Sequence, residues 1–133
     1  MTHIRPSAVR AFVAASLLFA TATVMFVTVS YARAAGALAI GPCGAYGEAH
    51  DFRGIQAARE SALSKCKGDT CRVVTSTRRG CAAFAVDFPN PCGANGWAKG
   101  PRLASSLNAA LDACYKDGGT DCVVRAFFCD AKG

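Results

Sequence analysis

The segment Cys81-Ala82-Ala83-Phe84-Ala85-Val86 carries the pattern that decides the fold, because its last four residues match the earlier segment Ala37-Leu38-Ala39-Ile40. In both segments small and large apolar residues alternate with the two-residue period of a β-strand. Similar motifs follow each segment in the same order: Cys-Gly-Ala, then Ala-Leu-x-x-Cys, then a cysteine before paired valines. We therefore predict an internal repeat, with copy one at about 36–80 and copy two at about 81–130.

A helix is expected inside each copy, from about Arg53 to Cys66 in the first and from Pro101 or Arg102 to Cys114 in the second. Alanine, leucine and the final cysteine share one face of each helix at helical spacing. The segments that follow, Cys71–Thr77 and Cys122–Phe128, are rich in β-branched or aromatic residues and are expected to be strands.

The turn Arg78-Arg79-Gly80 is so short that a hairpin is expected to join the strands on its two sides. With the strands near 37–40 and 81–86, the order becomes βαββαβ. We predict an α+β fold of duplicated βαβ units that form one four-stranded antiparallel sheet, with two helices on one face and disulfides stapling the domain.

All eight cysteines follow residue 42 and fall into two sets of four. The first set is Cys43, Cys66, Cys71 and Cys81, and the second is Cys92, Cys114, Cys122 and Cys129. Sequence alone allows 105 pairings, and the repeat narrows them because equivalent cysteines should pair equivalently. A tight turn separates Cys66 from Cys71 and Cys114 from Cys122, so these two pairs are expected. The remaining pairs, by difference, are Cys43–Cys81 and Cys92–Cys129.

Metal binding and redox catalysis are the alternative uses of these cysteines. Two four-cysteine sets would suit two zinc ions, but zinc sites and redox enzymes usually contain Cys-x-x-Cys, which the sequence lacks. An even number of cysteines in an exported chain favours disulfides. We therefore expect no bound metal and no cofactor.

Residues 1–34 have the pattern of a secretory signal peptide. Arg5 and Arg10 precede an uncharged apolar run, and Ala32-Arg33-Ala34 supplies the small-x-small triplet that signal peptidase requires, so cleavage is expected after Ala34. The alternative is an uncleaved membrane anchor. The threonines lower the hydrophobicity of the apolar run and the triplet favours cleavage, so both disfavour an anchor. The mature chain, 35–133, is then one secreted or periplasmic domain with no membrane span.

Net charge gives little information about partners. The whole chain has a formal charge of +6, but from Ala35 onward there are 12 basic and 9 acidic residues. This modest excess concerns solubility and predicts no nucleic-acid partner. A protein or another envelope component is the expected partner.

Several segments together resemble the bacterial secreted proteins grouped as domain of unknown function 4189. They are Gly36–Ile40, Ala62–Cys66, Cys71–Val74, Gly80–Val86 and, in the second half, Gly96-Trp97-Ala98 with the helix after it. The resemblance covers nearly all of 36–129 and implies export and duplication, but no activity. The chain departs from the family pattern at Glu48-Ala49-His50, where an aromatic-rich turn is usual, and at Pro101.

Few side chains qualify as functional candidates. Trp97 lies in a distinctive glycine-rich loop and Tyr46 in the matching loop of copy one, where each either contacts a ligand or covers the end of the core. Arg78 and Arg79 would meet an acidic partner or simply be exposed at a turn. His50, flanked by acids, is either a general base or an ordinary surface histidine.

These features favour a binding module over an enzyme. No catalytic motif is present, and a rigid scaffold with exposed loops suits an inhibitor, an immunity-like factor or an envelope accessory protein. The alternatives are a small extracellular hydrolase that uses His50, and a structural or stress-protective envelope protein.

Overall fold

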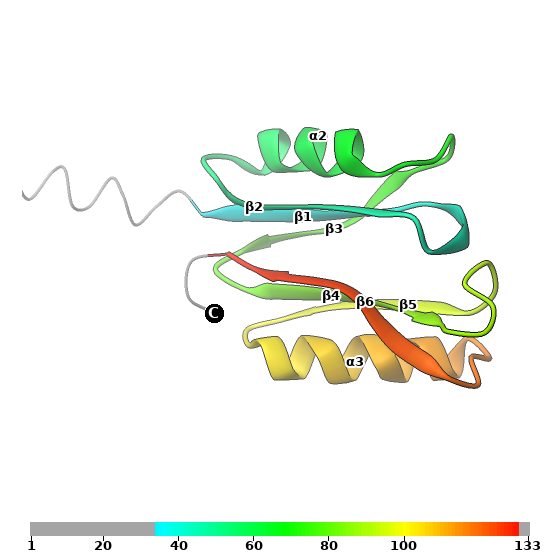
Figure 1. The fold of residues 1–133 in the computed structure, drawn as a ribbon. Coiled ribbons are helices and arrows are strands. Elements are labelled where there is room, and N and C mark those ends of the chain that lie inside the picture. Colours follow the sequence, from blue (N-terminus) through cyan, green and yellow to red (C-terminus); the bar gives the residue numbers. More distant parts are fainter. Residues whose placement is uncertain (1–33, 131–133) are drawn as a thin grey trace, which may run out of the picture. The chain divides into compact units, whose positions relative to one another are not determined.

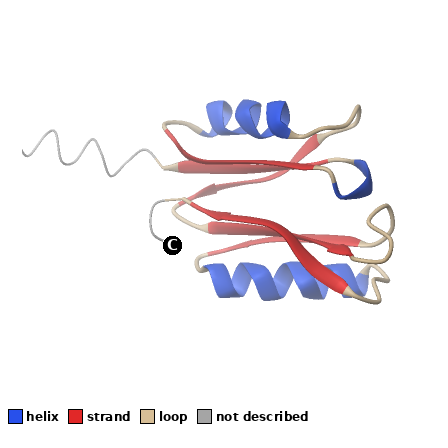
Figure 2. Cartoon of the chain, in the orientation of Figure 1, coloured by secondary structure: helices blue, strands red, loops and turns tan. Residues whose placement is uncertain are grey.

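A computed structural model describes residues 34–130 of the protein (Figure 1). It contains six strands, two α-helices and one 3-10 turn (Figure 2). Their bounds are β1 Ala35–Ile40, η1 Pro42–Gly44, β2 Tyr46–Phe52, α2 Ile55–Lys65, β3 Arg72–Arg78, β4 Cys81–Asp87, β5 Asn95–Gly100, α3 Leu103–Lys116 and β6 Cys122–Cys129.

The strands form two antiparallel three-stranded sheets, ordered β2-β1-β3 and β5-β4-β6. The fold is therefore α+β as predicted, but the single four-stranded sheet was wrong. β2 and β5 were predicted as loops, because both segments contain glycine and no β-branched residue. Each half of the chain thus has the order ββαβ rather than βαβ.

The two sheets lie face to face between the two helices, which gives four layers (Figure 1). Large side chains such as Leu38 and Phe84 fill the space between the sheets. The alanines that alternate with them, among them Ala37 and Ala83, face the helices. The prediction that both helices pack on one face of a single sheet was therefore wrong. Both faces of each central strand are apolar, so one face packs against a helix and the other against the second sheet.

Two glycines let the helices approach their sheets closely. A Cβ atom on Gly47 of β2 would lie 2.0 Å from the carbonyl oxygen of Ala62 in α2. A Cβ atom on Gly96 of β5 would lie 2.3 Å from the backbone nitrogen of Cys114 in α3. Because both distances are far below a normal contact, only glycine fits at these positions without a shift of the helix.

The turn at Arg79–Gly80 leads from one sheet to the other. β3 pairs with β1, whereas β4 pairs with β5 and β6. The predicted hairpin between β3 and β4 was therefore wrong, although the turn is as short as expected. Two apolar strands that follow each other closely can stack in facing sheets as well as pair within one, and the local sequence does not separate the two arrangements.

All eight cysteines form disulfides. Cys66–Cys71 and Cys114–Cys122 agree with the predicted pairs, and each fastens a helix to the strand after it.

The two long-range disulfides differ from the prediction: Cys43 is bonded to Cys92, and Cys81 to Cys129. The predicted Cys43–Cys81 and Cys92–Cys129 pairs were wrong because Cys81 was grouped with the first set of cysteines, as the counterpart of Cys129 in the second set. Cys81 instead opens β4, where it lies directly opposite Cys129 of β6. Cys43–Cys92 joins the turn after β1 to the loop after β4, so this bond links the two halves.

Neither helix in residues 34–130 has the length and hydrophobicity that a bilayer span requires.

Candidate functional site

Trp97 lies on β5 at the border of the core between the sheets. Its neighbour Gly96 faces α3, so the alternation along the strand turns the Trp97 side chain toward the other sheet. It lies opposite Phe84 in the β4–β5 ladder, and Phe84 is buried in that core. Trp97 is 39 % exposed, so it presents apolar surface to solvent.

A hollow of about 420 Å³ separates β5 from β3, the edge strand of the other sheet. Trp97 and Lys99 line it from β5, and Arg59 lines it from α2. The other lining residues are Ile55, Val73, Val74, Thr75 and Ser76.

A second hollow, of about 340 Å³, adjoins the first and shares Ser76 and Lys99 with it. Its remaining lining residues are Thr77, Arg78, Arg79, Gly80, Gly100 and Pro101. We call the two hollows together the β3–β5 groove. The groove therefore brings Trp97, Arg78 and Arg79, three of the four predicted binding residues, to one continuous surface.

The charges that line the β3–β5 groove are all positive. Four basic side chains contribute to it, Arg59, Arg78, Arg79 and Lys99, and neither hollow has an aspartate or glutamate in its lining. Cations gathered along a concave surface add their fields and attract anions. The arrangement suits a ligand that offers negative charge together with apolar surface for the indole.

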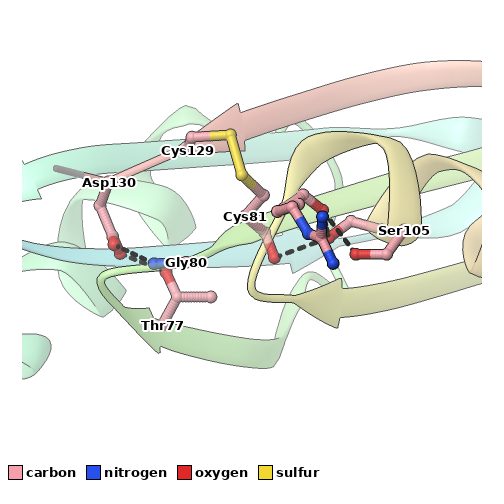
Figure 3. Close-up of a disulfide and its surroundings, with 8 residues drawn as sticks. Thr77, Gly80, Cys81, Ser105, Cys129 and Asp130 are labelled. Atoms are coloured by element: carbon pink, nitrogen blue, oxygen red, sulfur yellow. Dashed lines mark hydrogen bonds between the residues drawn. A yellow bond between two sulfur atoms is a disulfide. The ribbon is translucent and has the colours of Figure 1, made fainter. Parts of the chain in front are cut away.

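A buried carboxylate holds the turn that carries the two arginines (Figure 3). Asp130 is fully buried, and its side chain accepts hydrogen bonds from the hydroxyl of Thr77 and from the backbone N–H of Gly80. The Asp130 backbone N–H in turn donates to the carbonyl of Gly80, at 2.9 Å. The neighbouring Cys81–Cys129 disulfide fastens the same end of β6 to β4. The turn therefore has a fixed position at one end of the groove.

A second carboxylate organises the opposite end of β4. Asp87 accepts hydrogen bonds from the backbone N–H groups of Asp121, at 2.8 Å, and Thr120, at 2.9 Å. The Asp121 hydrogen bond above all, together with those from Thr120, holds the pKa of Asp87 below its ordinary value against an opposing effect of burial. This group fixes the loop between α3 and β6 and does not line the groove.

Tyr46 and His50 lie at the opposite edge of the first sheet, on β2. Tyr46 is 37 % exposed, but it is not among the residues that line the groove, so the structure does not bring it together with Trp97. The His50 ring stacks on Phe128, with the ring centres 6.4 Å apart. No cysteine remains as a thiol nucleophile for this histidine, because all eight are in disulfides.

Metal ligation has no evident place in the described part of the chain. No group of three or more His, Cys, Asp or Glu side chains lies close enough to hold an ion within residues 34–130. The two four-cysteine sets considered for zinc are consumed by disulfides.

Arg59 and Lys99 line the groove but were not among the predicted binding residues. A signal for Lys99 existed, because it lies two residues after Trp97 and hence on the same face of a strand. Recognising β5 as a strand would have revealed it. Arg59 belongs to the neighbouring helix of the other half, and no local pattern in the sequence connects it with Trp97.

A sequence model of one protein family, described as Domain of unknown function (DUF4189), matches residues 35–129. The chain therefore belongs to this family, as the resemblance of its motifs indicated. No curated protein and no solved structure matches the chain.

Proposed function

We propose that this member of the DUF4189 family is a binding module that works outside the cytoplasm and uses the β3–β5 groove to hold a negatively charged partner. The observation that carries the proposal is the composition of the groove. The one tryptophan of the chain and four cations line the two hollows of the groove, neither of which has an acidic residue in its lining. Trp97 also lines a third hollow outside the groove, where the charged residues are Arg72, Lys116 and Asp117. Aromatic and arginine side chains are the groups that most often dominate binding energy at protein interfaces.

The proposed location rests on the cysteines. Four disulfides are typical of secreted and periplasmic proteins, since the cytosol keeps thiols reduced. The predicted signal peptide, with cleavage after Ala34, lies outside the described residues except for Ala34 itself and is part of the proposal. The repeat is part of it as well: each half supplies a three-stranded sheet and a helix in the same order, which supports an origin by duplication.

The test compares single alanine variants of the mature, oxidised protein. The wild type, immobilised, is used to capture partners from cell-envelope extracts, and the captured partner is then titrated with each variant. We expect Trp97→Ala and Arg78→Ala each to weaken binding about tenfold or more. Arg125→Ala is the matched control, because Arg125 is exposed on β6 at the far edge of the second sheet.

The pattern of losses decides the outcome. Binding that falls with both groove variants and persists in Arg125→Ala supports the groove as the contact surface. Equal affinity in Trp97→Ala, Arg78→Ala and wild type overturns the assignment.

A further inference from the structure

β5 differs from the other edge strands of the described sheets in the regularity of its pairing. β2, β3 and β6 each show a register shift in the ladder that joins them to the central strand. β5 pairs with β4 without a shift from Asn95 to Gly100. Such irregularities protect sheet edges by twisting them and interrupting their row of donors and acceptors. Within residues 34–130, β5 is therefore the edge best suited to accept another strand.

The backbone groups at this edge belong to Trp97 and Lys99. The carbonyl of Ala94 accepts a hydrogen bond from the N–H of Asp87, at 3.0 Å, so the even-numbered residues of β5 face β4. The odd-numbered residues consequently turn their N–H and C=O groups outward. The N–H of Asn95 already donates to the Asp117 carboxylate, at 3.0 Å, which is consistent with this direction. Trp97 and Lys99 then present donors and acceptors to an added strand.

The side chains of the same two residues point into the β3–β5 groove. A peptide strand paired with β5 would place alternate side chains beside Trp97 and Lys99. These side chains would lie in the groove that Arg78 of the facing sheet also lines. Acidic side chains on that face would meet Lys99 and Arg78, and an apolar one would meet the indole. Charge complementarity thus selects an acidic strand.

We propose that the ligand of the groove is an extended acidic peptide segment that adds to β5 as a fourth strand of the second sheet. This inference rests on the proposed function and narrows it to one ligand class. A polyanion such as nucleic acid or a sulfated glycan would satisfy the cations but not the backbone groups of Trp97 and Lys99. A second copy of this chain, paired β5 to β5, would bring the cations of two grooves together.

The test uses backbone-methylated peptides with the mature, disulfide-bonded protein. The probe is a labelled extended peptide that carries glutamates and one valine on the same strand face, and its binding is measured by fluorescence anisotropy. Two further peptides carry N-methyl groups, one on the odd-numbered and one on the even-numbered residues. The two have the same composition and charge, but in any one strand register only one of them loses the N–H groups that face β5.

We expect one methylated peptide to bind about tenfold or more weakly than the unmodified probe, and the other to bind within about twofold of it. Lys99→Ala should weaken the unmodified peptide, whereas Arg125→Ala should not. Hydrogen exchange should show slower exchange of the Trp97 and Lys99 amides in the complex. Together these results establish strand addition.

Other results overturn the inference and separate it from the proposed function. Equal loss or equal retention with the two methylated peptides means that the contact is ionic and does not involve the edge. A sulfated polysaccharide that binds through Arg78 and Trp97 when the peptides do not refutes the peptide and leaves the groove as a binding surface. Dimerisation that protects the Trp97 and Lys99 amides without ligand means that a second copy occupies the edge. Failure of all probes, with partner capture unchanged in the groove variants, removes the proposed function as well.

Discussion

Replacing Gly96 with alanine tests the close approach of α3 to β5. The new Cβ atom would lie 2.3 Å from the backbone nitrogen of Cys114, 2.4 Å from the carbonyl oxygen of Ala110 and 2.8 Å from the carbonyl carbon of Ala113. Ordinary contacts begin near 3.4 Å, so α3 must move outward by about 1 Å. The helix resists this movement, because the Cys114–Cys122 disulfide ties it to β6 and Ala110 packs in the buried cluster beneath it.

Overpacking of this kind costs about 1–3 kcal/mol, and the clash with backbone rather than side chain places Gly96→Ala in the upper part of that range. For a domain of this size, we expect the melting temperature to fall by roughly 10–20 °C. Gly47→Ala in the first half should behave alike, since its Cβ atom would lie 2.6 Å from the backbone nitrogen of Cys66. Urea unfolding followed by circular dichroism measures the free-energy change.

Gly54→Ala is the matched control, because a Cβ atom at Gly54 meets nothing within 4 Å and the backbone there is extended. Its cost should stay below about 1 kcal/mol, the effect of changing the residue before a helix. If Gly96→Ala is no more destabilising than Gly54→Ala, α3 does not lie as close to β5 as the structure has it.

Four further predictions concern the core between the sheets, the two buried carboxylates and the long-range disulfides. Phe84→Ala should lower the free energy of unfolding by about 3–5 kcal/mol, because Phe84 is 1 % exposed and packs between the sheets. Phe88→Ala is the control and should change this free energy by less than about 0.5 kcal/mol, because Phe88 is 68 % exposed. Equal losses in urea unfolding would contradict the burial of Phe84 between the sheets. The pKa of Asp87 lies below its ordinary 3.8 in the folded protein, so the Asp87 carboxylate stabilises the fold above pH 3.8 and loses this effect as pH falls through the lower folded value. The difference in unfolding free energy between wild type and Asp87→Asn should therefore become smaller in acid. A difference that grows in acid would contradict the hydrogen bonds to Asp87. Asp130→Ala leaves the Thr77 hydroxyl and the Gly80 N–H buried without their acceptor, so calorimetry should show a loss of about 2–5 kcal/mol, with a smaller loss in the acceptor-retaining Asp130→Asn. Non-reducing cleavage with trypsin and at Asp87 separates all eight cysteines, and mass spectrometry should then find Cys43 linked to Cys92 and Cys81 linked to Cys129. A linked pair of peptides that joins Cys43 to Cys81 would refute the structure here.

The apolar strands β1 and β4 were predictable from the sequence, and the more polar strands β2 and β5 were not. Ala37–Ile40 and Ala83–Val86 alternate small and large residues, and strands formed at both. The sequences of β2 and β5, YGEAHDF and NGWAKG, lack the branched residues that indicate strands. Their glycines are required by the helices packed on them, a constraint that depends on the tertiary arrangement and is invisible in a local window.

The error in the disulfides came from the same source. Cys81 follows β3 so closely in sequence that it was grouped with the first four cysteines, and the symmetric pairing inherited that grouping. In the structure the position equivalent to Cys81 is Ala35, which lies opposite Arg78 as Cys81 lies opposite Cys129. The first half therefore lacks the bridge between its first and last strands, and the cysteines left over, Cys43 and Cys92, connect the halves. The disulfide pairing depends on which residue lies opposite each cysteine in the neighbouring strand. This strand register cannot be read from the spacing of cysteines in the sequence.

The positive charges beside β5 explain how its regular edge can remain exposed. Most proteins protect such an edge with bulges, a covering segment or charge. β5 has no bulge, and its outward residues include Lys99, which faces the arginines of the adjoining hollow. A strand from another copy of this chain would bring its own cations to this surface and be repelled, whereas an acidic strand would be attracted. The same charges thus oppose self-association and select the proposed partner, so reversing one of them with Lys99→Glu should weaken both effects together.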